Sequence, residues 1–290
     1  VLVTRPTELK ALVAHHGTLS QARFFLESRG QNLEVLEQRD ERFQQSMSAL
    51  LQAIPGKWRQ SRLDRSDLPS FLFGPEDIVI VLGQDGLVAN VAKYLDGQPV
   101  IGLNPDPASI PGVLVRHPAS ATADLLADAA SGRAEVEQRA MIQAALDDGQ
   151  TLLALNEVFI GHCSHQSARY RLQWQLKEER QSSSGLIVSS GTGSTGWARS
   201  VGLERHTKLP LPLPTDPKAV FFVREAWPSP FTGTALTEGL IPIGQNLKVT
   251  SEMNEGGVLF GDGLELDHLS FPWGAEATLG IAPKTLHLIA

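Results

Sequence analysis

Cysteine and basic charge are both scarce in this sequence, and each scarcity excludes a class of protein. Cys163 is the only cysteine among 290 residues, so no intramolecular disulfide can form and nothing marks an oxidising compartment. The formal net charge of −7 leaves no broad basic surface for a nucleic-acid backbone or an anionic membrane. No apolar run approaches the ~18 residues of a membrane span, and no signal-peptide pattern opens the chain. We therefore expect a cytoplasmic protein that binds neither nucleic acid nor a membrane.

The first part of the chain alternates strand-like and helix-like segments. Helical patterns that end at glycine or proline occupy residues 19–30, 41–56 and 119–132. Ser20 is the expected cap of the first of them. Two β-branched apolar runs, at 77–83 and 99–104, flank a helical pattern at 87–97. This order is typical of a βαβ unit in a parallel sheet that is covered by helices.

The second part of the chain is mostly strand-like. Residues 168–176 alternate strictly between apolar and polar side chains, which predicts a half-buried strand. Further short strands are expected at 218–226, 245–252, 256–263 and 284–289. The proline-rich segment 208–217 is an extended connector that cannot be a helix. Residues 135–146 fit either a helix or the first strand of this part.

These patterns predict two domains of different class. Residues 1–133 are expected to form an α/β domain with a Rossmann-like parallel sheet. Residues 134–290 are expected to form a mostly antiparallel β domain, whose last strand is free to return to the first domain.

A single carboxylate lies between glycines where the first apolar run ends, in Gly83-Gln84-Asp85-Gly86. Open α/β sheets bind ligands at the carboxyl ends of their strands, and the N–H groups at a following helix start favour anions. A plain strand-to-helix turn with Asp85 as the helix N-cap explains the tetrapeptide equally well. A P-loop is excluded because no Gly-Lys-Ser/Thr sequence follows.

A turn rich in glycine and hydroxyl groups follows the expected strand at 185–188. Residues 191–196 satisfy the pattern G-x-G-x-x-G, but a dinucleotide fingerprint opens a βαβ unit and has an acidic residue about 20 positions later. Asp216 has that distance and lies in the proline-rich connector, so we reject the dinucleotide interpretation. The turn either cradles phosphate or ribose, or forms an Ω-like surface loop.

Polar residues with metal-binding or ligand-binding potential occur in two further places. Asn156 and Glu157 interrupt the apolar segment 153–161, where burial is costly unless they hydrogen-bond to a ligand or to an internal backbone feature. The other place holds His162, Cys163 and His165. Three ligands within four residues lack the spacing of a zinc site, and no partner cluster exists. We interpret that stretch as a turn and expect no metal bound directly by the protein.

Taken in order, three of these stretches resemble the signatures of the NAD kinase family. Those signatures are Gly-Gly-Asp-Gly, an Asn-Glu pair, and a Thr/Gly/Ser loop that ends in an aromatic residue; here they read GQDG, NE and SSGTGSTGW. The stretches GLNPDP and FFVRE are similar to the branch of mitochondrial-type NAD kinases and their bacterial relatives. The resemblance covers residues 75 to 290, in order.

The resemblance implies an NAD kinase-like two-domain fold with the active site in the cleft between the domains. The family transfers the terminal phosphoryl group of ATP to the 2′-hydroxyl of the adenosine ribose of NAD, giving NADP. It implies Mg²⁺ or Mn²⁺, held with the nucleotide phosphates, as cofactor. The implied partners are small-molecule nucleotides and other copies of the chain, in a homodimer or higher homo-oligomer.

Carried over position by position, the resemblance implies that Asp85 is the catalytic carboxylate, which accepts the hydroxyl proton or positions it. An Asp at its reference pKa of about 3.9 is a weak base, so unless that pKa is raised we expect orientation to matter more than proton removal. The implied nucleotide-binding residues are Gly83, Gly86, Asn156, Glu157, Thr192, Gly193, Ser194, Thr195 and Trp197. Further candidates are Gln84, Asn104, Ser184 and Arg224.

The sequence also departs from the family pattern. Gln84 replaces the second glycine, Leu87 replaces the usual Thr, and Ser184 stands where many members carry Asp, a change that recurs in the mitochondrial-type branch. Because Gln84 adds a side chain where phosphates would approach, a catalytically impaired NAD(P)-binding protein is a second hypothesis. A lipid or other-alcohol kinase of the diacylglycerol kinase-like group is a third, although those enzymes usually lack the two later signatures.

Overall fold

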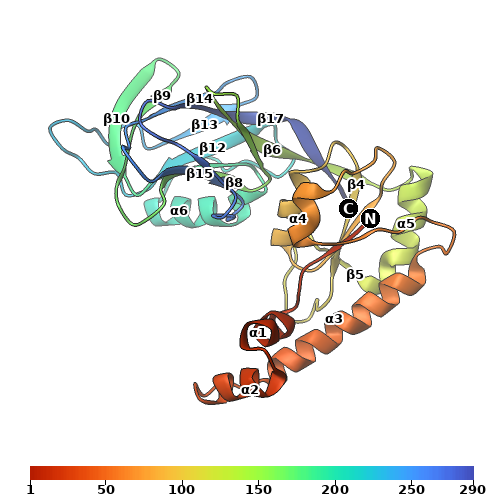
Figure 1. Cartoon of the computed structure of the whole chain (residues 1–290). Coiled ribbons are helices and arrows are strands. Elements are labelled where there is room, and N and C mark those ends of the chain that lie inside the picture. The colour runs from red at the N-terminus through yellow and green to blue at the C-terminus, as the bar shows by residue number, and fades with distance from the viewer. The chain divides into compact units, whose positions relative to one another are not determined.

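The computed structural model describes all 290 residues, and its contacts divide the chain into two compact units (Figure 1). Unit 1 comprises Val1–Glu137 with His287–Ala290, and unit 2 comprises Gln138–Leu286. Two strands, β6 (Val136–Leu146) and β17 (Glu276–Ile289), contribute residues to both units. The expected domain division at residues 133 and 134 stays a prediction.

Unit 1 is built around a parallel sheet. Its strands are β1 (Leu2–Thr4), β2 (Arg62–Asp64), β3 (Val79–Leu82), β4 (Pro99–Asn104) and β5 (His117–Pro118). The strand order is β2-β1-β3-β4, and both β5 and the end of β17 also pair with β4 in parallel. β3 is apolar and buried throughout, as a strand covered on both faces must be. The predicted βαβ unit is confirmed.

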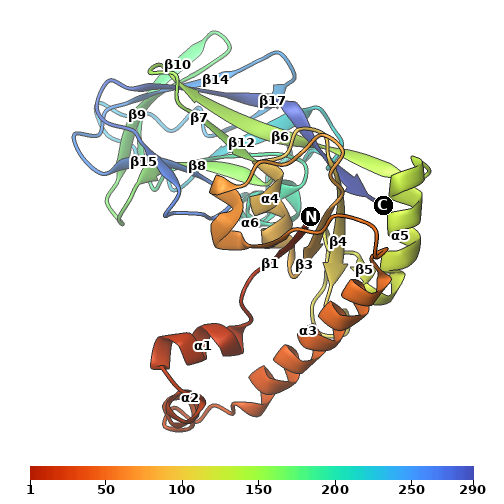
Figure 2. The same cartoon turned by 45° about the vertical axis from the view of Figure 1, so that its right-hand side comes forward.

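Five α-helices belong to unit 1. They are α1 (Glu8–His16), α2 (Leu19–Glu27), α3 (Glu34–Ala53), α4 (Asp85–Ala92) and α5 (Thr122–Ser131), with 3-10 turns at Arg65–Ser70 and Ala119–Ala121. Leu50 of α3 and Leu126 of α5 pack in one core with Leu82 and Ile101, so both helices cover the same face of the sheet. α1 buries no residue, and it projects from the sheet together with α2 (Figures 1 and 2).

The helices differ from the sequence prediction at the N-terminal end of this unit. Thr18 caps α2 by accepting a hydrogen bond from the Gln21 N–H (3.2 Å), so the prediction of Ser20 as the cap was wrong. α3 begins at Glu34 rather than at residue 41, and α1 was not predicted. These segments bury few side chains, so the apolar periodicity that predicts helices is weak there.

Unit 2 is a sandwich of two sheets. Its further strands are β7 (Thr151–Ala154), β8 (Glu157–His162), β9 (Ala168–Trp174), β10 (Lys177–Ser183), β11 (Leu186–Ser189), β12 (Lys218–Val223), β13 (Glu238–Pro242), β14 (Leu247–Ser251), β15 (Gly257–Gly261) and β16 (His268–Ser270). One sheet is antiparallel with the order β13-β12-β11-β8-β15-β16. In the other, β10-β9-β14-β17 are antiparallel neighbours, and β6 pairs with β17 and β7.

The core of unit 2 lies between these two sheets. Tyr170 and Leu172 of β9 pack in one cluster with Val188 of β11 and Phe221 of β12. The helix α6 (Trp197–Arg205) covers the other face of the six-stranded sheet through a second cluster that includes its Val201. The predicted mostly antiparallel β domain is confirmed.

Three local predictions for unit 2 need comment. The ambiguous segment 135–146 is strand β6 rather than a helix. The apolar segment 153–161 is not one strand, because the chain bends at Leu155 and Asn156 between β7 and β8. The alternating pattern of residues 168–176 predicts a strand with Leu176 on its apolar face, but β9 ends at Trp174. Gln175 adopts a left-handed φ of 55° in the hairpin turn, and Leu176 is fully exposed.

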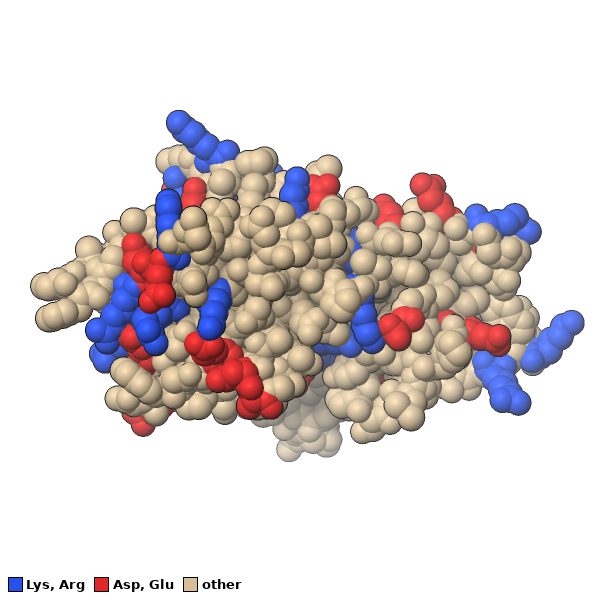
Figure 3. All heavy atoms as spheres, turned by 90° about the horizontal axis from the view of Figure 1, so that it is seen from above, with Lys and Arg blue, Asp and Glu red and all other residues tan.

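The surface charge agrees with the composition. On the face shown in Figure 3, Lys and Arg side chains lie among Asp and Glu and form no continuous basic field. None of the helices has the length and apolar character that crossing a membrane requires.

Candidate active site

The residues predicted to form the site fall into both units. Gly83 to Gly86 and Asn104 belong to unit 1, and all the other predicted residues belong to unit 2. In unit 1 the Gly83 N–H donates to the Leu103 carbonyl of the neighbouring strand (3.1 Å), which fixes where the chain leaves β3.

Gln84, rather than Asp85, is the N-cap residue of α4. Gln84 makes no capping hydrogen bond; its Oε1 accepts a hydrogen bond from Arg5 Nη2 at 2.6 Å. Asp85 is therefore the first residue inside the helix, and the alternative that it serves as a simple helix cap is wrong.

The Asp85 carboxylate binds the backbone of a loop that follows β4. Its Oδ1 accepts hydrogen bonds from the N–H groups of Leu114 (2.8 Å) and Val115 (3.0 Å), and its Oδ2 accepts one from Val113 (2.9 Å). A carboxylate offers about four lone-pair positions, so three backbone donors leave about one for a ligand. Asp85 is half-buried and tightly oriented, which suits a group that aligns a hydroxyl.

The loop bound by Asp85, residues 105–116, is anchored at its other end as well. The Asn104 amide donates to the Ile110 carbonyl (2.7 Å) and accepts from the Asp106 N–H (2.9 Å), so both of its polar groups shape this loop. Asp106 accepts a hydrogen bond from the Arg42 guanidinium (2.5 Å), and this contact holds the pKa of Asp106 below its usual range. Nucleotide binding by Asn104 stays a prediction.

In unit 2 the second and third signatures are joined by Ser190. The Ser190 hydroxyl donates to the Leu155 carbonyl and accepts from the N–H groups of Thr192 (3.1 Å) and Gly193 (3.3 Å). The Ser190 N–H donates to the Asn156 carbonyl (2.8 Å). One serine, which the sequence interpretation did not single out, thus ties the Asn156 turn to the glycine-rich turn.

The glycine-rich turn approaches Asn156 so closely that only glycine fits at position 193. A Cβ on Gly193 would lie 2.2 Å from the Asn156 carbonyl oxygen. The hydroxyls of Ser194 and Thr195 donate to backbone carbonyls of the same turn (both 2.9 Å), so they hold its shape. The remaining hydroxyl, that of Thr192, lies 3.4 Å from the guanidinium of a buried arginine, Arg139.

Arg139 was missed by the sequence interpretation. It is 1% exposed and lies on β6, in the segment 135–146, whose sequence fits either a helix or a strand. A charged side chain beside the apolar run that begins at Ala140 was the available signal, because a buried guanidinium is costly unless it is paired.

Trp197 packs at the start of α6. Its ring stacks on Phe159 of β8, with centroids 5.9 Å apart and an angle of 15° between the planes. The Arg224 guanidinium lies 5.0 Å from the Trp197 ring centroid, in cation–π geometry. Ser184 is joined to Arg224 by a backbone hydrogen bond from its N–H to the Arg224 carbonyl (2.9 Å). The structure thus brings Trp197, Arg224 and Ser184 into one neighbourhood, and their role in binding stays a prediction.

Glu157 is the titratable group of unit 2 with the most strongly altered environment among the predicted residues. Burial raises its pKa to about 7, with a further contribution from the charge of Asp262. A carboxyl group with a pKa near neutrality is partly protonated at physiological pH, and groups with such altered pKa values cluster at functional sites.

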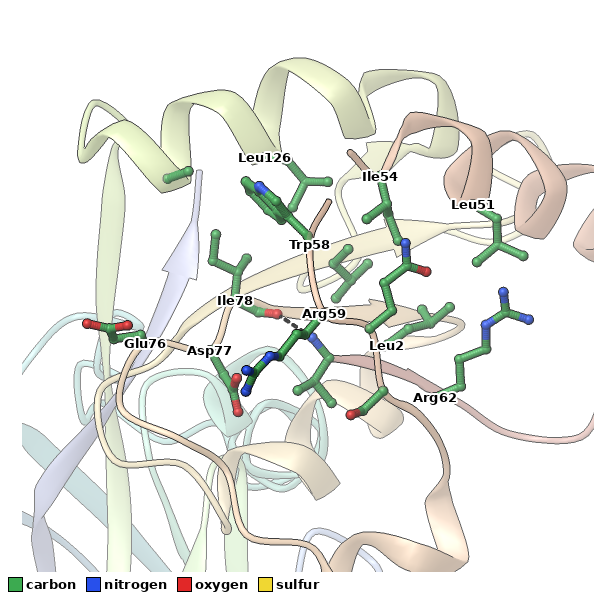
Figure 4. Close-up of a pocket in the computed structure, with 15 residues that line it drawn as sticks. Leu2, Leu51, Ile54, Trp58, Arg59, Arg62, Glu76, Asp77, Ile78 and Leu126 are labelled. Carbon is green, nitrogen blue, oxygen red and sulfur yellow. Dashed lines mark hydrogen bonds between the residues drawn. The ribbon is translucent and has the colours of Figure 1, made fainter. Parts of the chain in front are cut away.

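A separate cavity of about 540 Å³ lies in unit 1 (Figure 4). It opens near the amino ends of β1 and β3, where Leu2 and Ile78 line it together with Trp58 and Leu126. The turn that carries Asp85 follows the carboxyl end of β3, so this cavity lies at the other end of that strand. None of the predicted site residues lines it.

Comparison with known proteins gives sequence relatives for part of the chain. No family model matches it. The NAD kinase of Cupriavidus pinatubonensis is 34% identical over 135 residues, which are 43% of this chain and 43% of that protein. The NAD kinase of Heliobacterium modesticaldum is 33% identical over 151 residues, which are 47% of this chain and 52% of that protein. The match thus spans about half the length of these curated relatives.

The fold has a counterpart among solved structures. The crystal structure of yeast NADH kinase complexed with NADH matches with a TM-score of 0.62 and 14% sequence identity, over 86% of this chain and 79% of that chain. At this identity the likeness concerns the fold alone. It confirms the expected two-domain class, an α/β unit followed by a mostly antiparallel β unit.

Proposed function

We propose that the chain is an NAD kinase, which uses ATP to phosphorylate the 2′-hydroxyl of the adenosine ribose of NAD and gives NADP. The proposal rests on one observation: Ser190 hydrogen-bonds to both the Asn156 turn and the glycine-rich turn, and so holds the two turns together. The similarity to proteins named NAD kinase supports it. A cytoplasmic location and a homo-oligomeric state stay predictions.

Phosphoryl transfer asks the protein mainly for alignment and charge neutralisation. Asp85, oriented by three backbone donors, would align the acceptor hydroxyl and take its proton as the phosphoryl group moves. Asn156 and Glu157 would hold the adenosine portion of NAD, and Thr192 and Trp197 would line the same pocket. A divalent cation bound to the nucleotide phosphates would supply the remaining positive charge. No three His, Cys, Asp or Glu side chains are grouped as a protein-held metal site requires.

A catalytically impaired NAD(P)-binding protein is the second candidate. Two observations favour it: Gln84 adds a side chain to the first signature, and most of the acceptor capacity of Asp85 is used by backbone donors. Gln84 is held by Arg5, so its side chain has a fixed partner of its own.

One assay separates these candidates. The purified chain is incubated with ATP and Mg²⁺ and, in parallel, with NAD, NADH, diacylglycerol or sphingosine, and ADP release is measured. We expect ADP release with a dinucleotide, matched by NADP or NADPH formation. Calorimetric binding of NAD without turnover identifies the impaired binder, and ADP release with a lipid alone identifies the third hypothesis.

Gly86→Ala tests whether a nucleotide approaches the backbone at the start of α4. A Cβ there meets nothing within 4 Å, and alanine favours helix over glycine by about 1 kcal/mol, so the free energy of unfolding should rise. If ATP phosphates accept hydrogen bonds from this backbone, the added methyl group blocks such a contact. The loss of one hydrogen bond should raise the KM for ATP by about tenfold. Thermal unfolding and steady-state kinetics measure the two effects. If the variant is more stable and its KM for ATP is unchanged, Gly86 is not part of the nucleotide site.

A further inference from the structure

Asp262 follows strand β15 and hydrogen-bonds to the turn that carries Asn156 and Glu157. Its Oδ1 accepts the N–H of Asn156 at 2.7 Å, and its Oδ2 accepts the N–H of Leu155 at 3.1 Å. Its own N–H donates to the Glu157 carbonyl at 3.0 Å. Asp262 therefore makes three hydrogen bonds, two as acceptor and one as donor, to three consecutive residues that lead into β8.

The backbone of Asp262 is adapted to this contact. Asp262 adopts a left-handed φ of 55°, a conformation that Asp and Asn tolerate better than most residues. The following residue, Gly263, also has a positive φ, of 69°. The chain therefore turns sharply after β15, and it does so where the Asp262 carboxylate meets the two N–H groups of the neighbouring turn.

We propose that Asp262 is a positioning residue of the nucleotide site, which holds Asn156 and Glu157 in their binding geometry and places a second carboxylate beside that of Glu157. This inference rests on the proposed binding of NAD by Asn156 and Glu157. Asp262 acts through these two residues, and nothing requires it to touch the nucleotide.

The two carboxylates are electrostatically coupled. Burial is the main cause that raises the pKa of Glu157 to about 7, and the negative charge of Asp262 adds to it. Among the elements packed against Glu157, β11 places the neutral Ser189 opposite it, and β15 leads into Asp262. The nearby glycine-rich turn is contacted at Thr192 by the cation of Arg139.

The sign of the pH effect follows from this arrangement. Glu157 is mostly protonated below pH 7 and mostly ionised above it, so an interaction of NAD with this group changes strength around pH 7. Replacing Asp262 by a neutral side chain removes one of the two causes that raise the Glu157 pKa. The pH midpoint of NAD binding must then move to lower pH.

The test uses calorimetric titration of NAD into the full chain from about pH 5 to about pH 9. Wild-type protein should show a midpoint near pH 7 in the dissociation constant. Asp262→Asn keeps one acceptor oxygen and loses the other, so it should weaken NAD binding by about tenfold and lower the midpoint. Glu157→Gln should abolish the midpoint in this range, because an amide does not titrate.

Asp148→Asn is the matched control. Asp148 also accepts a backbone N–H, that of Gln150 (2.9 Å), in the exposed hairpin turn between β6 and β7. This variant should bind NAD with the wild-type affinity and midpoint. A midpoint that stays near pH 7 in Asp262→Asn overturns the inference.

The outcomes separate this inference from the proposed function. If Asp262→Asn fails to fold, Glu157→Gln decides, and a wild-type midpoint in that variant overturns the inference. If the wild-type protein binds NAD with a midpoint near pH 7 and the variants change that midpoint as expected, but no NADP forms, the inference stands and the proposed kinase activity is excluded. Wild-type protein that does not bind NAD overturns both.

Discussion

Asp85→Asn is expected to lower kcat for NADP formation by 10²–10⁴-fold, the usual contribution of a positioned acid–base group. Asparagine keeps one oxygen, which can accept the N–H groups of Leu114 and Val115 as Oδ1 does now. Its amide NH₂ group would face the Val113 N–H and cannot accept from a substrate hydroxyl. The dissociation constant for NAD should change by less than about threefold, because Asp85 is assigned to the reaction and not to dinucleotide binding.

The expected cost in stability is small enough to be separated from the loss of activity. One lost backbone hydrogen bond costs about 1 kcal/mol, which denaturant unfolding can measure. Asp77→Asn is the matched control, since Asp77 also accepts a backbone N–H in unit 1, that of Gly74 (2.7 Å), before β3 begins. A kcat within about threefold of wild type in Asp85→Asn would restrict Asp85 to holding the 105–116 loop.

The parallel sheet of unit 1 was predictable because its signals are local. β3 and β4 are short, apolar runs that are buried on both faces. Gly83 directly follows β3, and Gly97 lies two positions before β4. The helix at 122–131 ends at Gly132, which adopts a left-handed φ of 70° as a C-terminal glycine commonly does. In contrast, α1 buries no side chain, so no apolar periodicity marked it.

The arrangement within the candidate site was less predictable because it depends on contacts between distant residues. In the sequence, Asp262 is one residue of the turn-like stretch FGDG. Its hydrogen bond with the Asn156 N–H forms only because β15 pairs with β8. In the sequence, Ser190 is one of several hydroxyl residues in a row. Its role in joining the two turns depends on the Leu155 carbonyl, to which its hydroxyl donates. The sequence alone allows Asp85 either an N-cap role or a catalytic role. The structure excludes the N-cap role, because Gln84 is the N-cap residue and the Asp85 carboxylate accepts from the Leu114 N–H instead.

Gly193→Ala is expected to lower kcat/KM for NAD by at least about 100-fold, the effect of displacing a binding group by about 1 Å. The new Cβ would lie 2.2 Å from the Asn156 carbonyl oxygen and 2.4 Å from Ser189 Oγ. Neither atom can yield easily, because the Asn156 carbonyl already accepts the Ser190 N–H (2.8 Å) and is bonded by the Ser189 hydroxyl (3.3 Å). The glycine-rich turn must therefore move away from the Asn156 turn.

Overpacking of this kind also costs about 1–3 kcal/mol of stability, so the kinetics are measured at a temperature where thermal unfolding shows the variant to be folded. Gly56→Ala is the matched control, because Gly56 lies in an exposed turn of unit 1 and a Cβ there meets nothing within 4 Å. The control should retain wild-type kinetics. A folded Gly193→Ala variant with unchanged kcat/KM would show that NAD binding does not need the close approach of the two turns, and the observation on which the proposed function rests would lose its force.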